Sequence, residues 1–196
     1  MTADPKIIVI AGCNGAGKST LAPYLLRDTL GLTDYVNADT IAQGLSAFSP
    51  EKVAVEAGHV MLKRLRDLAE RRETFAFETT LATRFYASWI AELKQQGYEF
   101  YLLFLWLDDV ELAVERVKER VKLGGHSIEE STIHRRYFRG LRNFFELYQP
   151  LADSWALYDN SYRGNPILIA DSGENAETKI HNLDLWQKLC EMKNSK

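Results

Sequence analysis

Short apolar runs alternate along the chain with longer stretches whose apolar positions recur at helical spacing. The apolar runs predict six strands, over residues 7–10, 35–37, 74–78, 100–107, 156–158 and 167–170. Between them, residues 51–72 and 85–93 show the one-sided apolar pattern of amphipathic helices. Strands that alternate with helices favour a parallel sheet with helices on both faces. We therefore expect a doubly wound α/β fold, and the length of 196 residues fits a single domain over residues 1–196.

A glycine-rich segment separates the first predicted strand from a stretch that can continue as a helix. It reads Gly12-Cys13-Asn14-Gly15-Ala16-Gly17-Lys18-Ser19 and is followed by Thr20. In a strand, loop and helix context, this spacing predicts a phosphate-binding loop whose backbone N–H groups face the phosphates. Lys18 would reach the β- and γ-phosphates, and the Ser19 hydroxyl would ligate Mg²⁺. The residues expected to bind ATP are Gly12, Asn14, Gly15, Ala16, Gly17, Lys18, Ser19 and Thr20.

Acidic side chains follow several predicted strands, at the positions where ligands of parallel sheets bind. Asp39 comes after the second strand and just before a helical stretch. It is either a helix N-cap or the base, or orienting acceptor, for a hydroxyl that attacks the γ-phosphate. Asp108 follows the fourth strand, where it either caps a helix or orients a metal, and Asp109 suits the cap equally well.

Glu78 ends an apolar strand, where a carboxylate is costly unless it is paired, solvated or near a cation. This position predicts either recognition of a substrate hydroxyl or an indirect contact with Mg²⁺. Thr79 and Thr80 add hydroxyl groups beside it. Together with Asp39 and Arg84, these residues form the predicted acceptor-binding set.

Positive charge is concentrated in residues 116–142, which hold eight Lys or Arg and three acids. The net charge of this segment is +5. Because the whole chain has a net charge of −3, the rest of the chain carries −8. A Gly-Gly turn divides it into two helices, and we expect a hinged lid that closes over polyphosphate. In the second helix, Arg135, Arg139 and Arg142 share one face opposite an apolar face, and Arg136 lies on the border. At least two of the lid arginines are expected to contact phosphate.

The overall composition narrows the set of partners and compartments. A net charge of −3 and a pI near 5.9 argue against nucleic-acid binding by the whole surface. No apolar run approaches the ~20 residues that a membrane-spanning helix needs. Cys13 and Cys190 form no metal or redox motif, which favours a reducing compartment. We therefore expect a cytoplasmic protein without nucleic-acid or membrane partners.

Four segments taken together resemble the zeta-toxin-like P-loop kinases. They are the phosphate loop from Ala11 to Thr20, Asn37-Ala38-Asp39-Thr40-Ile41-Ala42, Phe75-Ala76-Phe77-Glu78-Thr79-Thr80-Leu81, and the stretch from Gly124-Gly125-His126 to Arg135-Arg136-Tyr137. The resemblance implies the core fold of adenylate and shikimate kinases and transfer of the ATP γ-phosphate to a small-molecule hydroxyl. In the toxins, that hydroxyl belongs to a UDP-linked N-acetylamino sugar, and an antitoxin is a partner that the resemblance allows.

The resemblance also implies roles for the lid arginines. Arg116 or Arg120 corresponds to the first lid arginine of the family. Their spacing is also similar to adenylate-kinase-type enzymes, in which one arginine lies over adenine and the next contacts phosphate. In long toxins a second lid arginine precedes the following helix, where this chain has its Gly-Gly-His turn. Arg135, Arg136 or Arg139 would then replace it from the helix itself.

By position, Asp39 matches the proposed base of the family, Lys18 its phosphate lysine and Glu78 a substrate-side acid. We predict an ATP- and Mg²⁺-dependent kinase that phosphorylates a small-molecule hydroxyl. Its catalytic residues would be Lys18, Asp39, Arg120 and Arg136, with Arg116 on the nucleotide. Two alternatives stay open: a non-catalytic ATP-binding regulatory module, and a nucleoside or sugar kinase unrelated to toxicity.

Overall fold

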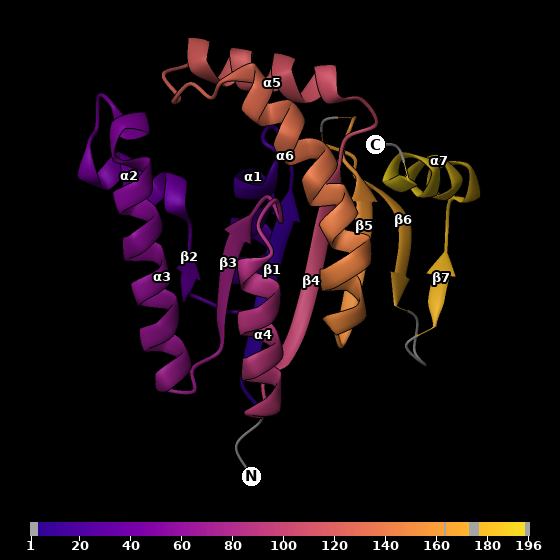
Figure 1. Cartoon of the computed structure of the whole chain (residues 1–196), viewed down its shortest axis with the longest axis horizontal. Helices are drawn as coiled ribbons and strands as arrows, with labels where there is room; N and C mark the ends of the chain where they lie inside the picture. Colours follow the sequence, from indigo (N-terminus) through magenta and orange to yellow (C-terminus); the bar gives the residue numbers. More distant parts are fainter. Residues whose placement is uncertain (1–3, 163, 173–176, 195–196) are drawn as a thin grey trace.

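Seven strands form one mixed sheet within residues 4–162, 164–172 and 177–194, which are the residues that this computed structural model describes (Figure 1). The strands are β1 Lys6–Gly12, β2 Tyr35–Val36, β3 Phe75–Thr79, β4 Glu99–Trp106, β5 Ser154–Asp159, β6 Ile167–Ser172 and β7 Thr178–Ile180. Their order across the sheet is β2-β3-β1-β4-β5-β6-β7, and the pairs from β2 to β5 are all parallel. The predicted α/β fold is confirmed.

The two strands at one edge of the sheet depart from the prediction of an all-parallel sheet. β6 pairs antiparallel with β5, and β7 pairs antiparallel with β6. Residues 160–166 join β5 to β6, and this connection is too short for the helical crossover that a parallel pair requires. β7 is a short, exposed Thr-Lys-Ile segment, so it lacks the apolar alternation from which a strand is predicted.

Helices cover both faces of the sheet. They are α1 Lys18–Ala22, the π-helical segment Pro23–Thr29, α2 Ala38–Leu45, the 3-10 turn Pro50–Val53, α3 Ala54–Glu70, α4 Phe85–Gln95, α5 Val110–Lys122, α6 Glu130–Asn143, the π-helical segment Phe144–Tyr148, the 3-10 turn Gln149–Leu151 and α7 Leu183–Asn194. α3, α4 and α6 lie on one face, and α1 lies behind the sheet (Figure 1). Within the described residues, none of the helices is both long and apolar enough to cross a membrane.

β1, the middle one of the five parallel strands, is buried on both faces because its side chains alternate between two cores. Ile7 and Val9 belong to the larger core under α3, α4 and α6. Ile10 belongs to a smaller core with Ala22 and Leu26, which come from α1 and the π-helical segment after it. The double burial explains the continuous apolar run in the sequence and fixes the start of the loop that follows Gly12.

Helix α5 crosses above the carboxyl ends of the strands, and α6 returns along one face of the sheet (Figure 1). The predicted apolar face of α6 is buried through Ile133, Tyr137 and Leu141. The helix sits very close to the backbone, because a Cβ on Gly140 would lie 2.3 Å from the carbonyl oxygen of Thr80. Only a glycine permits that approach, so α6 is seated directly on the loop after β3.

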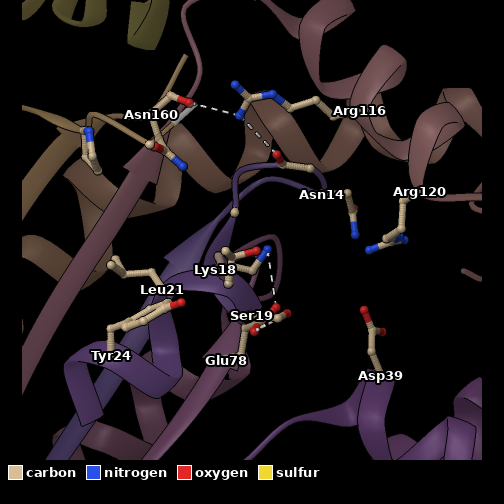
Figure 2. A pocket seen from close by; sticks show the side chains of 15 residues that line it. Asn14, Lys18, Ser19, Leu21, Tyr24, Asp39, Glu78, Arg116, Arg120 and Asn160 are labelled. Carbon is tan, nitrogen blue, oxygen red and sulfur yellow. Dashed lines mark hydrogen bonds and ion pairs between the residues drawn. The ribbon is translucent and has the colours of Figure 1, made fainter. Parts of the chain in front are cut away.

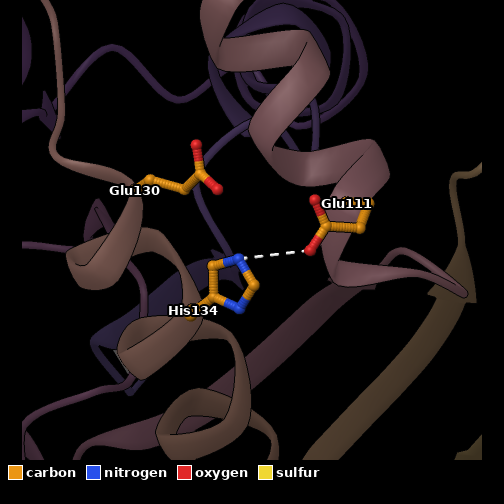
Figure 3. A group of neighbouring side chains, drawn as sticks. All are labelled: Glu111, Glu130 and His134. Atoms are coloured by element: carbon orange, nitrogen blue, oxygen red, sulfur yellow. Dashed lines mark ion pairs between the residues drawn. The ribbon is translucent and has the colours of Figure 1, made fainter.

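Polar side chains connect α5 to α6 on the surface (Figure 3). His134 Nε2 lies 3.3 Å from Glu111 Oε1, and Lys118 Nζ lies 3.0 Å from Glu130 Oε2. Asp109 caps α5 by accepting a hydrogen bond from the Glu111 N–H, as the sequence predicts. These ion pairs are largely exposed, so each contributes at most about 1 kcal/mol to stability.

Candidate active site

The loop between β1 and α1 has the backbone of a phosphate-binding loop. Gly12 adopts φ +142°, and a Cβ there would lie 2.2 Å from the carbonyl oxygen of Leu105 on the neighbouring strand. Gly15 adopts φ +82°, and its Cβ would lie 2.9 Å from the carbonyl oxygen of Ala113 in α5. Both glycines are therefore required, the first for packing on the sheet and the second for contact with α5.

Lys18 and Ser19 begin α1 directly after this loop. The Lys18 side chain is only 7% exposed, and its ammonium lies 3.6 Å from Glu78 Oε1. It also donates a hydrogen bond to the carbonyl oxygen of Cys13 at 2.9 Å. Burial raises the pKa of the Cys13 thiol to about 11, although the Lys18 charge opposes that effect. The thiol in the loop is thus a neutral, buried group.

Glu78, at the end of β3, is the centre of a hydrogen-bond network next to the loop. Its Oε2 accepts hydrogen bonds from the Ser19 hydroxyl at 2.8 Å, the Tyr35 hydroxyl at 2.7 Å and the Asn37 amide at 2.9 Å. Burial and the adjacent Glu78 raise the pKa of Tyr35, so the phenol stays neutral and donates. This arrangement puts the carboxylate on the Ser19 side of the site, where a divalent cation bound by that hydroxyl would lie.

A cavity of about 690 Å³ opens over the loop (Figure 2). Its described lining residues are Asn14, Gly15, Gly17, Lys18, Ser19, Thr20, Leu21, Tyr24, Asp39, Glu78, Arg116, Arg120, Asn160, Gly164 and Pro166. Lys18 and Glu78 make one part of the lining polar and charged, and Leu21 and Tyr24 lie together at another part (Figure 2). The cavity therefore combines a phosphate-binding part with a more apolar part, as a nucleotide requires.

A second cavity of about 400 Å³ lies between α2 and the turn that joins α5 to α6. It is lined by Ser19, Asn37, Asp39, Thr40, Gln43, Arg120, Leu123, Gly124, Gly125 and His126. The two cavities share Ser19, Asp39 and Arg120. A molecule in the second cavity would therefore meet the phosphate end of a nucleotide in the first.

Asp39 lies in the first turn of α2, and the interpretation of Asp39 as the N-cap is wrong. Asn37 is the cap, because its side-chain oxygen accepts hydrogen bonds from the Asp39 and Thr40 N–H groups. The Asp39 side chain is thereby left to point into the shared region of the cavities, where it is 45% exposed (Figure 2). Its Oδ1 lies 3.7 Å from His126 Nε2.

The arginines of residues 116–142 fall into four groups, of which two come from α5. Arg116 donates to the carbonyl oxygens of Asn160 at 2.9 Å and Ser161 at 2.7 Å, so its guanidinium is held at the cavity wall. Arg120 lines both cavities and extends toward the side where Asp39 lies (Figure 2).

Of the three candidate replacements in α6, only Arg136 reaches the loop. It donates to Asn14 Oδ1 at 3.2 Å, and burial lowers its pKa while Asp39 acts in the opposite direction. Arg135 and Arg139, like Arg142, are on the exposed surface of the helix.

Some predicted substrate residues lie outside the described linings of both cavities. The Thr79 hydroxyl accepts a hydrogen bond from the Leu81 N–H, and Thr80 lies under α6. Arg84 is exposed at the start of α4. Asp108 is also outside both linings, and its backbone N–H bonds to the hydroxyl of Ser161.

Other residues of the site were missed by the sequence analysis. Asn160 donates from its amide to the carbonyl oxygen of Ala16 at 2.7 Å, beside the loop. It directly follows β5, so the rule that ligands bind beyond the carboxyl ends of parallel strands could have identified it. Tyr35 and Gln43 carry no such signal, because their proximity to the site depends on how the helices and strands pack. His126 belongs to the Gly-Gly-His turn of the family resemblance, but the sequence analysis gave it no role in the site.

Comparison with known proteins agrees with this architecture. The zeta toxin family model matches residues 1–161. An uncharacterized protein of Haemophilus influenzae is 29% identical over 132 residues, which cover 67% of this chain and 92% of that protein. A chain of the AvrRxo1-ORF1:-ORF2 structure with ATP is similar with a TM-score of 0.80 at 18% identity, covering 99% of this chain and 66% of that chain. For the PezAT toxin–antitoxin system of Streptococcus pneumoniae, the TM-score is 0.66 at 19% identity, covering 96% of this chain and 78% of that chain.

The family match runs from β1 through β5. It therefore includes the phosphate-binding loop, Asp39, Glu78 and both helices α5 and α6. The structural neighbours, at their low sequence identity, show the shared fold. The chain belongs to the zeta toxin family.

Proposed function

We propose that this chain is an ATP- and Mg²⁺-dependent kinase that transfers the γ-phosphate to a hydroxyl of a small molecule. The observation that carries the proposal is the junction of the two cavities, where Ser19, Asp39 and Arg120 line both. A nucleotide in the larger cavity would present its phosphates to a hydroxyl held in the smaller one. Phosphoryl transfer requires this arrangement, because the two substrates must be held next to each other.

The residues next to the loop fit a bound Mg²⁺. The Ser19 hydroxyl would be a direct ligand, and Glu78, 2.8 Å from that hydroxyl, would orient it or a water on the ion. When bound, the ion supplies positive charge to the β- and γ-phosphates. The Lys18 ammonium lies near the other carboxylate oxygen of Glu78, Oε1, and would add a second positive charge at the same phosphates.

The transfer step assigns a role to each remaining side chain. Asp39 accepts the proton of the acceptor hydroxyl, or orients it, as the oxygen attacks the γ-phosphorus. The new O–P bond forms as the bond to the β-phosphate oxygen breaks, and ADP leaves. Arg120 neutralises charge on the transferring group, and Arg136 adds positive charge behind Asn14. Arg116, held at the cavity wall by Asn160 and Ser161, would contact the nucleotide.

Several classes of small molecule are candidates for the acceptor. A UDP-linked N-acetylamino sugar is the first candidate, because the chain belongs to the zeta toxin family. Nucleosides and free sugars are the alternatives. We propose no antitoxin partner, because the likeness to the PezAT structure is one of fold.

Mass spectrometry of reactions with Mg-ATP and a panel of UDP-sugars, nucleosides and free sugars tests the proposal. Asp39→Asn should leave the ATP affinity within about twofold and lower turnover by about 10² or more, because the change removes the proposed base and leaves Lys18, Ser19 and the loop unaltered. Asp34→Asn is the matched control, since Asp34 pairs with Arg64 at 2.8 Å and lies outside both described cavities. Slow hydrolysis without any phosphorylated product would instead favour a regulatory ATP-binding module.

A further inference from the structure

Three side chains with metal-binding atoms meet where α5 and α6 lie against each other (Figure 3). Glu111 comes from the first turn of α5, and Glu130 and His134 come from α6. One ligand atom of each residue lies within 4.8 Å of the other two. Among the described residues, no other group of three His, Cys, Asp or Glu side chains comes together in this way. The group lies outside the described linings of both cavities of the candidate active site.

The distances within this group match those of ligands on a single ion. His134 Nε2 lies 3.3 Å from Glu111 Oε1. In a tetrahedral zinc site, whose bonds are about 2.0–2.1 Å long, two ligand atoms lie about 3.3–3.4 Å apart. Glu130 is four positions before His134, so the two side chains share one face of α6. Because the Glu130 side chain is 53% exposed, a change in its torsions can bring its carboxylate to the same separation.

The chemistry of the three donors selects the kind of metal. One imidazole nitrogen and two carboxylate oxygens suit zinc and related transition metals. Mg²⁺ and Ca²⁺ instead prefer a set made of oxygen ligands. The two carboxylates also balance the charge of a divalent cation. Three protein ligands leave the fourth tetrahedral position to water.

Lys118 is the group with which a metal ion would compete. Its ammonium lies 3.0 Å from Glu130 Oε2, and the two side chains are 65% and 53% exposed. Solvent screens such a pair, so the pair is weak. A divalent cation held by two further ligands offers Glu130 a stronger partner than this one ammonium. The lysine would therefore lower the affinity for metal without closing the site.

We propose that Glu111, Glu130 and His134 form a binding site for a divalent transition metal of the zinc class, and that the ion joins α5 to α6. Bonds from one ion to both helices would replace the weak ion pairs that now connect them. α5 carries Arg120 and α6 carries Arg136, so the ion would fix the two helices that bring these arginines to the candidate active site. The site is separate from the Mg²⁺ site proposed at the phosphate-binding loop, and its existence does not depend on the proposed kinase function.

Competition between the metal-free full chain and a zinc-binding dye, in excess Mg²⁺, measures the affinity for Zn²⁺. We expect one Zn²⁺ per chain. H134A and E111Q should each weaken binding at least about tenfold, because even an outer partner of a metal ligand contributes 10- to 100-fold. H181A is the matched control, since His181 lies 3.1 Å from Asp171 but belongs to no group of three ligands among the described residues. The absence of Zn²⁺ binding by the wild type, or equal affinities of H134A and H181A, overturns the proposal.

Two more measurements distinguish coordination from a general effect of substitution on the fold. K118M should tighten Zn²⁺ binding by up to about fivefold, because it removes the competing ammonium from Glu130. Zn²⁺ should also raise the Tm of the wild type and of K118M but not that of H134A, because an ion that binds the folded chain stabilises it. Weaker binding by K118M would contradict the place of Glu130 among the ligands. An equal rise in the Tm of H134A and of the wild type would contradict the site as a whole.

Discussion

Replacing Glu78 with glutamine should destabilise the fold itself, apart from any effect on activity. Glu78 is the counter-charge of Lys18, and the two side chains are only 10% and 7% exposed. The carboxylate also accepts hydrogen bonds from Ser19, Tyr35 and Asn37 on one oxygen. A glutamine amide can keep its oxygen toward these three donors only by turning its NH₂ toward the Lys18 ammonium. In the opposite orientation, the NH₂ faces the three donors.

The size of the effect follows from these contacts. Loss of one partner of a buried ion pair costs about 3–5 kcal/mol in unfolding free energy. The low end applies here, because Lys18 keeps its hydrogen bond to the Cys13 carbonyl oxygen at 2.9 Å. We therefore expect a loss of about 3 kcal/mol, which for a domain of this size lowers Tm by about 6–12 °C.

Urea denaturation of the nucleotide-free protein measures this loss, since bound ATP would add its own stabilisation. Glu99→Gln is a closely matched control. Glu99 also lies 3.6 Å from a lysine, Lys6, and accepts from a tyrosine hydroxyl, Tyr101 at 2.9 Å, but both members of its ion pair are 42% exposed. Its substitution should cost no more than about 1 kcal/mol. Equal losses for the two variants would refute the argument that the buried position of Glu78 decides the outcome.

Two further outcomes are expected. Arg136→Met should lower turnover about tenfold by removing the charge behind Asn14, whereas Arg139→Met on the exposed face should match the wild type in the same kinase assay. Burial raises the pKa of the Cys13 thiol from 9.0 to about 11, so its reactive thiolate is about a hundredfold scarcer at neutral pH. Iodoacetamide should therefore label the half-buried Cys190 before Cys13. The labelling of Cys13 should become faster as the pH rises toward 11. Peptide mapping measures both labelling rates, and faster labelling of Cys13 at neutral pH would contradict the burial argument.

Local patterns were sufficient to predict the core of the fold. Each of the six predicted strands is present, because the apolar runs of buried strands are set by neighbouring residues in the chain. The antiparallel edge was missed, since the direction of β6 depends on the length of the connection after β5 and on packing. β7 gave no local signal at all.

The sequence by itself determined the phosphate-binding loop, with Lys18 and Ser19, and the positions of Asp39 and Glu78 at the ends of parallel strands. These features depend on residue order and on the common rule that parallel strands end at one edge of the sheet. Only the tertiary structure decided that Arg136 rather than Arg135 or Arg139 reaches the loop. Helical spacing places these arginines on adjacent faces, and the seating of α6 on the sheet selects one of them.

The second cavity is also a product of tertiary structure alone. Gln43 and His126 are far apart in the chain and line one cavity only because α2 and the turn after α5 lie on either side of the same space. By contrast, Thr79 ends β3 and Thr80 follows it, and Arg84 precedes α4, yet all three lie outside both linings. Thr80 lies under α6, and Arg84 is exposed at the start of α4. Periodicity fixes which face of an element is apolar, whereas the contents of a cavity depend on the packing of several elements at once.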